Sequence, residues 1–150
     1  MSVNQALGRM LVLVAVFSVI QVALRAPYLH SPMAVRFNAA GHPVGWDTAQ
    51  SFATLNLVIV AIIVGICLIL PASLTRRRRL KWRLPNRDYW LAPERLAKTI
   101  EYIQRQFYWH GIVTLLLLMA VFQLVVDANA KKPPLLDSER LVWLLVGYAA

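Results

Sequence analysis

The sequence predicts an all-α, polytopic helical membrane protein: three complete spans, the start of a fourth and an interfacial amphipathic helix, in one domain of residues 1–150. Of its 150 residues, 59% are hydrophobic, which is more than soluble domains carry. No Asp, Glu, Lys or Arg occurs in residues 10–24, 48–75 or 106–126. Ten of the sixteen Lys and Arg residues lie between Thr75 and Arg105. Long apolar segments around a basic loop are typical of a membrane protein with a fixed orientation.

The first predicted span covers residues 6–25. Its uncharged part is short, but Arg9 and Arg25 can extend their side chains to opposite interfaces. With these flanks it crosses a hydrocarbon core of about 30 Å, which takes roughly 20 helical residues. A cleaved signal peptide is the alternative, but no small-residue cleavage site follows and the segment ends in a charge. We therefore expect an uncleaved span.

The loop that follows, residues 26–45, is rich in Pro, Gly, Asn and His, so we predict irregular structure with tight turns. Asp47 is expected to be the N-cap of the second helix, with Gln50 as its capping-box partner. The second span then covers residues 48–70. Its second half is apolar on every face, whereas a soluble helix keeps a charged face. The single cysteine, Cys67, is expected to pack as a small hydrophobic side chain.

The basic loop, residues 72–107, is expected to lie in the cytoplasm, because cytoplasmic loops are enriched in Lys and Arg. This layout places eleven Lys and Arg residues inside and five outside, which predicts an inside N-terminus. The run that starts the loop is expected to contact anionic lipid headgroups rather than nucleic acid. It consists of Arg76, Arg77, Arg78, Arg79, Lys81 and Arg83.

An amphipathic helix should begin at Pro93, because proline suits the first helical turn. It is expected either to lie in the membrane interface or to continue directly into the third span, residues 108–126. Asp137 or Ser138 can cap a fourth helix over residues 139–150. Only ten residues follow Arg140, and ten helical residues reach about 15 Å, half a bilayer. We expect the chain to stop early, or the segment to be half-inserted.

Residues 36–46 read Arg-Phe-Asn-Ala-Ala-Gly-His-Pro-Val-Gly-Trp. This segment resembles the domain of unknown function found in many small bacterial membrane proteins and in SdpI-type immunity proteins. Arg36 and Val44 stand where that family commonly has His and Asp. Residues 84–95 are similar to the loop after the second span in the short members. The resemblance implies a membrane protein, and SdpI-type members are associated with protection against a membrane-active toxin peptide and with signalling to a repressor.

The family-like segment has two interpretations. It is either a compact turn that seats the second helix, or an outward-facing recognition site for a peptide, lipid or protein partner. In the first interpretation Gly41 and Gly45 permit positive φ, and Asn38 bonds its own backbone. The candidate recognition residues are Arg36, Phe37, Asn38, Gly41, Pro43, Gly45 and Trp46.

No Ser–His–Asp or Cys–His arrangement, phosphate-binding glycine loop or HExxH sequence occurs, so we predict a non-enzymatic protein without a cofactor. His30 and His42 share a loop with Asp47, but their spacing and the lack of a third strong ligand argue against a metal site. The alternative function is a small transporter or channel component that uses polar intramembrane residues. Its candidates are Gln21 and Asn56, both expected to hydrogen-bond between helices, and Asp127.

Overall fold

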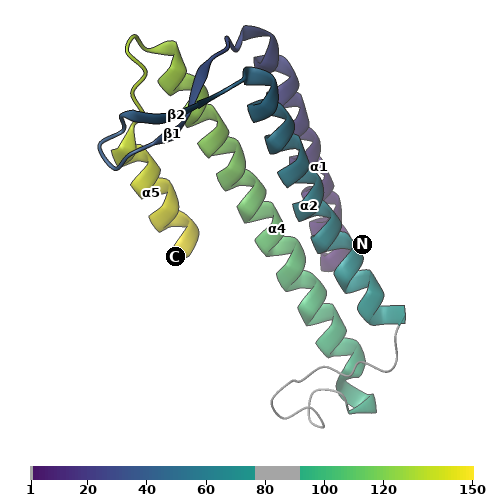
Figure 1. Cartoon of the computed structure of the whole chain (residues 1–150). Coiled ribbons are helices and arrows are strands. Elements are labelled where there is room, and N and C mark those ends of the chain that lie inside the picture. The colour runs from purple at the N-terminus through teal and green to yellow at the C-terminus, as the bar shows by residue number, and fades with distance from the viewer. Residues whose placement is uncertain (1, 77–91) are drawn as a thin grey trace.

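Three long helices run side by side and a β-hairpin covers one end of the bundle (Figure 1). This computed structural model describes residues 2–76 and 92–150, with the side chains of residues 74–76 excepted. The long helices are α1 (Val3–Arg25), α2 (Ala49–Arg76) and α4 (Pro93–Ala130). The hairpin consists of β1 (Met33–Phe37) and β2 (Pro43–Asp47), preceded by a short 3-10 turn, Ala26–Tyr28.

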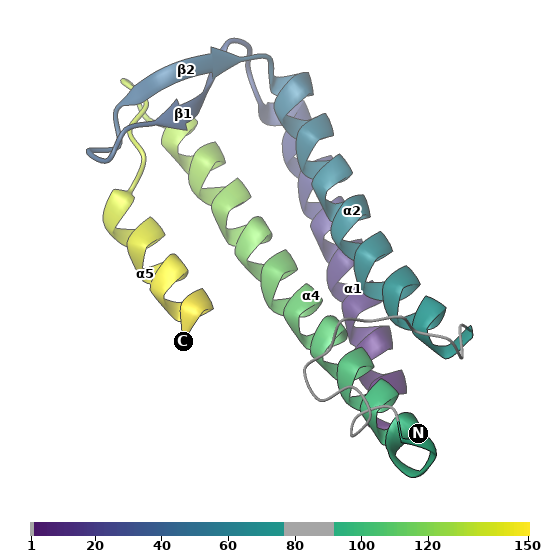
Figure 2. The same cartoon turned by 60° about the horizontal axis from the view of Figure 1, so that its bottom comes forward.

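A shorter helix, α5 (Ser138–Ala149), starts beside the hairpin and runs back along α4 (Figures 1 and 2). Its start is fixed by Asp137, whose side chain accepts a hydrogen bond of 2.9 Å from the Arg140 N–H. This confirms one of the two predicted caps. Near its other end, the Thr114 and Tyr148 hydroxyls lie 3.0 Å apart and join α4 to α5.

The helices α1, α2 and α4 are each long and apolar enough to cross a membrane. The predicted spans of residues 6–25 and 108–126 lie within α1 and α4, and α2 covers the predicted span of residues 48–70 except for its first residue. The bounds differ most for α4, which is continuous from Pro93 to Ala130. The helix expected to begin at Pro93 is thus continuous with the segment predicted as the third span, as in the second of the two predicted alternatives. No proline follows Pro93 within this helix, so its hydrogen-bond ladder has no reason to break.

The bundle core joins all three long helices through Leu11, Val60, Cys67, Ile112 and Leu115. Gly111 allows α4 to approach its neighbours closely. A Cβ atom at this position would lie 2.7 Å from Cys67 Sγ and 2.9 Å from Leu11 Cδ1, too close for real side chains. Cys67 itself is buried in this cluster, which confirms its prediction as a small core residue.

The predicted cap of α2 is wrong by one residue. The Thr48 side chain accepts the Ser51 N–H at 3.1 Å, as an N-cap does. Asp47 lies one position earlier and accepts the Thr48 N–H at 2.7 Å and the Ser51 hydroxyl at 3.0 Å. Gln50 takes no part in these bonds. Both Asp and Thr are good caps, so composition alone did not distinguish the two positions.

Candidate functional site

The family-like segment forms the β-hairpin, so the expectation of irregular structure in this loop is wrong, and the fold is mostly helical rather than all-α. The antiparallel register pairs Met33 with Asp47, Ala34 with Trp46, and Phe37 with Pro43. Apolar β-branched and aromatic residues occupy much of both strands, and such residues favour pleated structure. Asn38 and Gly41 belong to the turn and Pro27 and Pro32 to the flank, whereas Pro43 and Gly45 lie within β2 itself.

The turn of the hairpin is built by Asn38, as predicted for its side chain. The Asn38 N–H donates to the His42 carbonyl at 2.9 Å, and the His42 N–H donates to Asn38 Oδ1 at 2.9 Å. Gly41 donates to the Asn38 carbonyl at 2.9 Å. Its φ of +82° is a conformation that favours glycine. Asn38 and Gly41 therefore shape the loop rather than extend from it.

Asn129 on α4 fixes the hairpin to the bundle. Its Oδ1 accepts the Ala34 N–H at 2.7 Å, and its Nδ2 donates to the Ala34 carbonyl at 2.9 Å and to the Val125 carbonyl at 2.8 Å. Ala34 is fully buried. The side chain of Asn129 thus pairs with β1 as a strand residue would. Asn129 could not be identified from the sequence, because nothing near it in the sequence marks a strand partner.

A second apolar cluster lies beneath the hairpin and contains Met33, Leu124, Val125, Ala128 and Leu136. Leu136 belongs to the connection between α4 and α5, and its N–H donates to the Gly41 carbonyl at 2.9 Å. The hairpin is therefore held at its base by Asn129 and at its turn by Leu136.

The predicted recognition residues divide into a buried frame and an exposed group. Gly41 and Gly45 are buried, and Phe37 and Pro43 are partly buried. Arg36, Asn38 and Trp46 are exposed, as is Val44 between Pro43 and Gly45; half of the Trp46 surface is accessible. The Arg36 side chain lies against the face of Gly45, so that a Cβ there would contact its guanidinium. The structure thus supports a scaffold role for part of the motif and leaves another part on the surface.

Two of the three candidate transport residues share one cavity. Gln21 Nε2 donates to the Met119 carbonyl at 3.2 Å and reaches Gln123 Oε1 at 3.5 Å, which confirms its predicted interhelical bond. Gln123 Nε2 donates to Asp127 Oδ1 at 2.7 Å. These three side chains line a cavity of about 330 Å³ between α1, α4 and α5, together with Arg140.

Asn56 does not join this group, and its predicted interhelical bond is wrong. It is buried, but its amide donates to the Phe52 carbonyl at 2.9 Å, one turn earlier in α2. A helical amide can satisfy itself in this way, so its burial required no partner on another helix.

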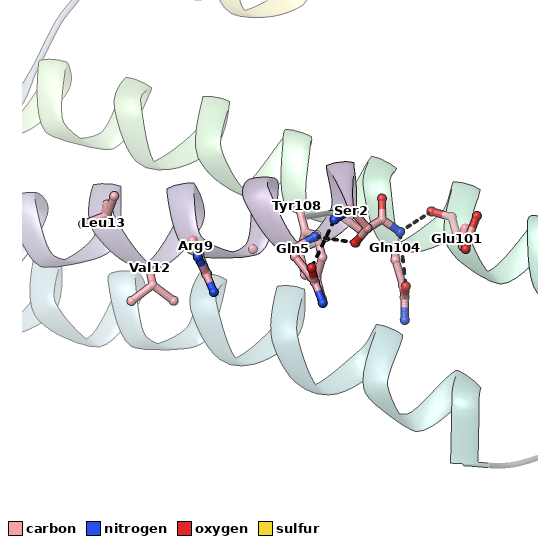
Figure 3. Close-up of a pocket in the computed structure, with 10 residues that line it drawn as sticks. Ser2, Gln5, Arg9, Val12, Leu13, Glu101, Gln104 and Tyr108 are labelled. Carbon is pink, nitrogen blue, oxygen red and sulfur yellow. Dashed lines mark hydrogen bonds between the residues drawn. The ribbon is translucent and has the colours of Figure 1, made fainter.

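A larger cavity of about 800 Å³ lies between α1 and α4 at the end of the bundle opposite the hairpin (Figure 3). Asn4 crosses between the helices there, donating to the Glu101 carbonyl at 3.0 Å and to Gln104 Oε1 at 3.3 Å. Polar side chains including Gln5 gather near these bonds, and Val12 and Leu13 line the opposite part. This cavity could not be predicted from the sequence, because its two walls are about a hundred residues apart in the chain.

The predicted lipid-contacting run lies almost wholly outside the described residues. Arg76 is the last residue of α2, but its side chain is not described, and Arg77, Arg78, Arg79, Lys81 and Arg83 fall in the segment that is not described. Within residues 2–76 and 92–150, no three His, Cys, Asp or Glu side chains gather into a group that could hold a metal ion.

Comparison with protein families, curated proteins and solved structures finds no match to this chain. The hairpin and the two cavities are therefore interpreted from their own chemistry.

Proposed function

We propose that this chain is a non-enzymatic membrane module that recognises a peptide or protein partner through the exposed face of the β1–β2 hairpin, in a protective or accessory role. The observation that supports this most is the division of the motif. Frame residues hold the turn and the base, while Arg36, Val44 and Trp46 remain accessible. A motif that served only to seat α2 would not require an exposed aromatic and an exposed cation.

The exposed group has the chemistry of a binding surface. Trp, Tyr and Arg are enriched among residues that dominate binding energy, and Tyr28, beside the hairpin in the chain, is 76% exposed. Because Asn129 and Leu136 already hold the hairpin, binding would cost little ordering of the backbone. Trp and Tyr also suit the membrane interface, so the partner would be met at the bilayer surface.

Under this proposal the hairpin lies outside a bacterial cytoplasmic membrane and the N-terminus lies inside. The distribution of Lys and Arg supports this orientation. So does the arrangement of the helices, because α2 ends and α4 begins at the end of the bundle opposite the hairpin (Figure 1). A reporter enzyme fused within residues 77–91 should be active only in the cytoplasm, and one inserted at residues 39–40 only outside.

The function is tested by survival of bacteria that express the chain, across a panel of membrane-active peptides. The wild-type chain should raise the lethal concentration of at least one peptide. Trp46→Ala and Arg36→Ala should each remove this protection without lowering membrane abundance. Trp143→Ala on α5, which removes another exposed tryptophan (66% exposed, against 50% for Trp46), is the matched control and should protect normally. Protection against no peptide, or full protection by the Trp46 variant, contradicts the proposal.

The linked side chains of Gln21, Gln123 and Asp127 support a second candidate function, a small transporter or channel component. Polar groups within membrane-spanning helices are costly and often line a pathway for ions or protons. Vesicles that contain the purified chain and an internal pH-sensitive dye test this. A pH gradient should then collapse faster with wild-type protein than with Asp127→Asn, and equal rates reject proton coupling.

A further inference from the structure

The cavity between α1, α4 and α5 has a charged end and an apolar end. Asp127, near the end of α4, and Arg140, in the first turn of α5, both line it at the hairpin end. Leu116 lies three helical turns before Asp127, and Leu144 one turn beyond Arg140; both line the cavity further from the hairpin. The cavity is therefore polar at the hairpin end and apolar further along the helix axis, as one leaflet of a bilayer is polar at its surface and apolar inside.

The polar side of this cavity is held in place. Gln123 accepts from Gln21 through Oε1 and donates to Asp127 through Nε2. Because both ends of its amide are engaged, its orientation is fixed and it positions Asp127 Oδ1. No hydrogen bond to Asp127 Oδ2 from another side chain or backbone group is found within residues 2–76 and 92–150.

Asp127 and Arg140, the two charged residues of the cavity, do not form an ion pair with each other. Among the described residues, Arg140 forms no ion pair within 4.0 Å, although it shares the cavity with Asp127. A carboxylate accepts hydrogen bonds from an ammonium group, and a guanidinium binds phosphate with two parallel hydrogen bonds. A ligand with a primary ammonium and a phosphate therefore complements both charges, and the apolar end would receive a hydrocarbon chain.

We infer that this cavity binds a zwitterionic phospholipid with a primary amine, of the phosphatidylethanolamine class, in the leaflet at the hairpin end. A volume of about 330 Å³ is within the range of small-molecule sites, roughly 300–1,000 Å³. A phospholipid is favoured over a soluble zwitterion because the cavity continues along helices that are long enough to span a membrane. The site shares no residue with the exposed face of the hairpin, so either proposal can fail alone.

Native mass spectrometry of the full chain, released from nanodiscs that contain equal amounts of three lipids, tests this inference. Phosphatidylethanolamine should be retained about tenfold over phosphatidylcholine, whose methylated amine has no N–H, and over phosphatidylglycerol, which has no cation. Asp127→Asn should abolish the preference for phosphatidylethanolamine over phosphatidylcholine. Arg140→Gln should weaken both about equally.

Glu139→Gln is the matched control, because Glu139 adjoins Arg140 on α5 but does not line the cavity. It should retain the wild-type preference. Equal retention of the three lipids by the wild-type chain overturns the inference whether or not any variant folds. So does loss of the preference in the Glu139 variant, which would reflect surface charge alone. Displacement of the lipid by millimolar soluble phosphoethanolamine would show a soluble ligand and reject the lipid.

Discussion

Replacing Asn129 with Ala should release the hairpin from the bundle. The substitution removes both hydrogen bonds to the Ala34 peptide group, at 2.7 and 2.9 Å, and leaves a donor and an acceptor unpaired in a fully buried residue. Each unpaired buried group costs about 1–3 kcal/mol. For the two groups together the loss in the free energy of opening is about 2–6 kcal/mol, which corresponds to exchange that is faster by at least about 30-fold. An isolated two-stranded hairpin is at best marginally stable, so its cross-strand bonds should open as well.

Hydrogen–deuterium exchange of the purified chain, followed by mass spectrometry on peptides that cover β2, measures this opening. The amides of β2 do not contact Asn129, so faster exchange there reports detachment of the whole hairpin. Asn129→Asp keeps the acceptor but places an oxygen against two carbonyl groups, and it should exchange at least as fast as the Ala variant. Asn4→Ala is the matched control, since it removes an amide that joins α1 to α4 at the opposite end. Exchange in β2 within twofold of wild type in the Asn129 variant, or an equal increase in the Asn4 variant, would refute this account.

Three further substitutions test the local geometry by thermal unfolding in detergent. Gly41→Ala should lower the midpoint and the membrane abundance, because φ is +82° and a Cβ would collide with the Leu136 carbonyl; Gly147→Ala, with nothing within 4 Å of its Cβ, should not. Gly111→Ala should lower the free energy of unfolding by about 1–3 kcal/mol through contact with Cys67 and Leu11. Each kcal/mol lost should lower the unfolding midpoint by about 2–4 °C. The control Gly65→Ala has its nearest contact at 4.0 Å, and an equal loss there would contradict close packing at Gly111. Thr48→Val should lower the free energy of unfolding by about 1 kcal/mol through loss of the N-cap, whereas Gln50→Ala should change it by no more than about 0.5 kcal/mol. A larger loss in the Gln50 variant than in the Thr48 variant would instead support the capping box predicted around Asp47.

The helices could be predicted from the sequence because their signal is local. Uncharged segments of sufficient length require helices in a membrane, where every backbone polar group must bond within the chain. A local signal also identified Asp137 as a cap. Another local signal is the Ser-x-x-Gln pattern of Ser2 and Gln5, which form a full capping box in the structure. The cap of α2 was displaced by one residue because two good capping residues are adjacent.

The hairpin could not be predicted because what holds it is distant in sequence. Ala34 and Asn129 are separated by 95 positions, and no pattern around either residue indicates the other. The turn chemistry of Asn38 and Gly41 was recognised, but the loop was interpreted as irregular structure because of its many Pro, Gly, Asn and His residues. The strands on either side have only five residues each, so their own signal is short. The cavities were missed for the same reason, since their walls come from helices remote in the sequence.

The interhelical polar contacts show which helix organises the fold. Asn4 and Gln21 join α1 to α4, Asn129 joins α4 to β1, and Thr114 joins α4 to α5. In a bilayer, apolar side chains gain little by exchanging lipid for helix, whereas such polar contacts contribute about 0.6–2 kcal/mol each. All of these polar contacts involve α4, whereas α2 packs against α4 through the apolar core that contains Val60 and Cys67. The hairpin also bonds the connection to α5 through Leu136, one residue before the cap that positions Arg140. A partner that shifts the hairpin would consequently move the guanidinium of the cavity, and this links the exposed face of the motif to the α4–α5 interface.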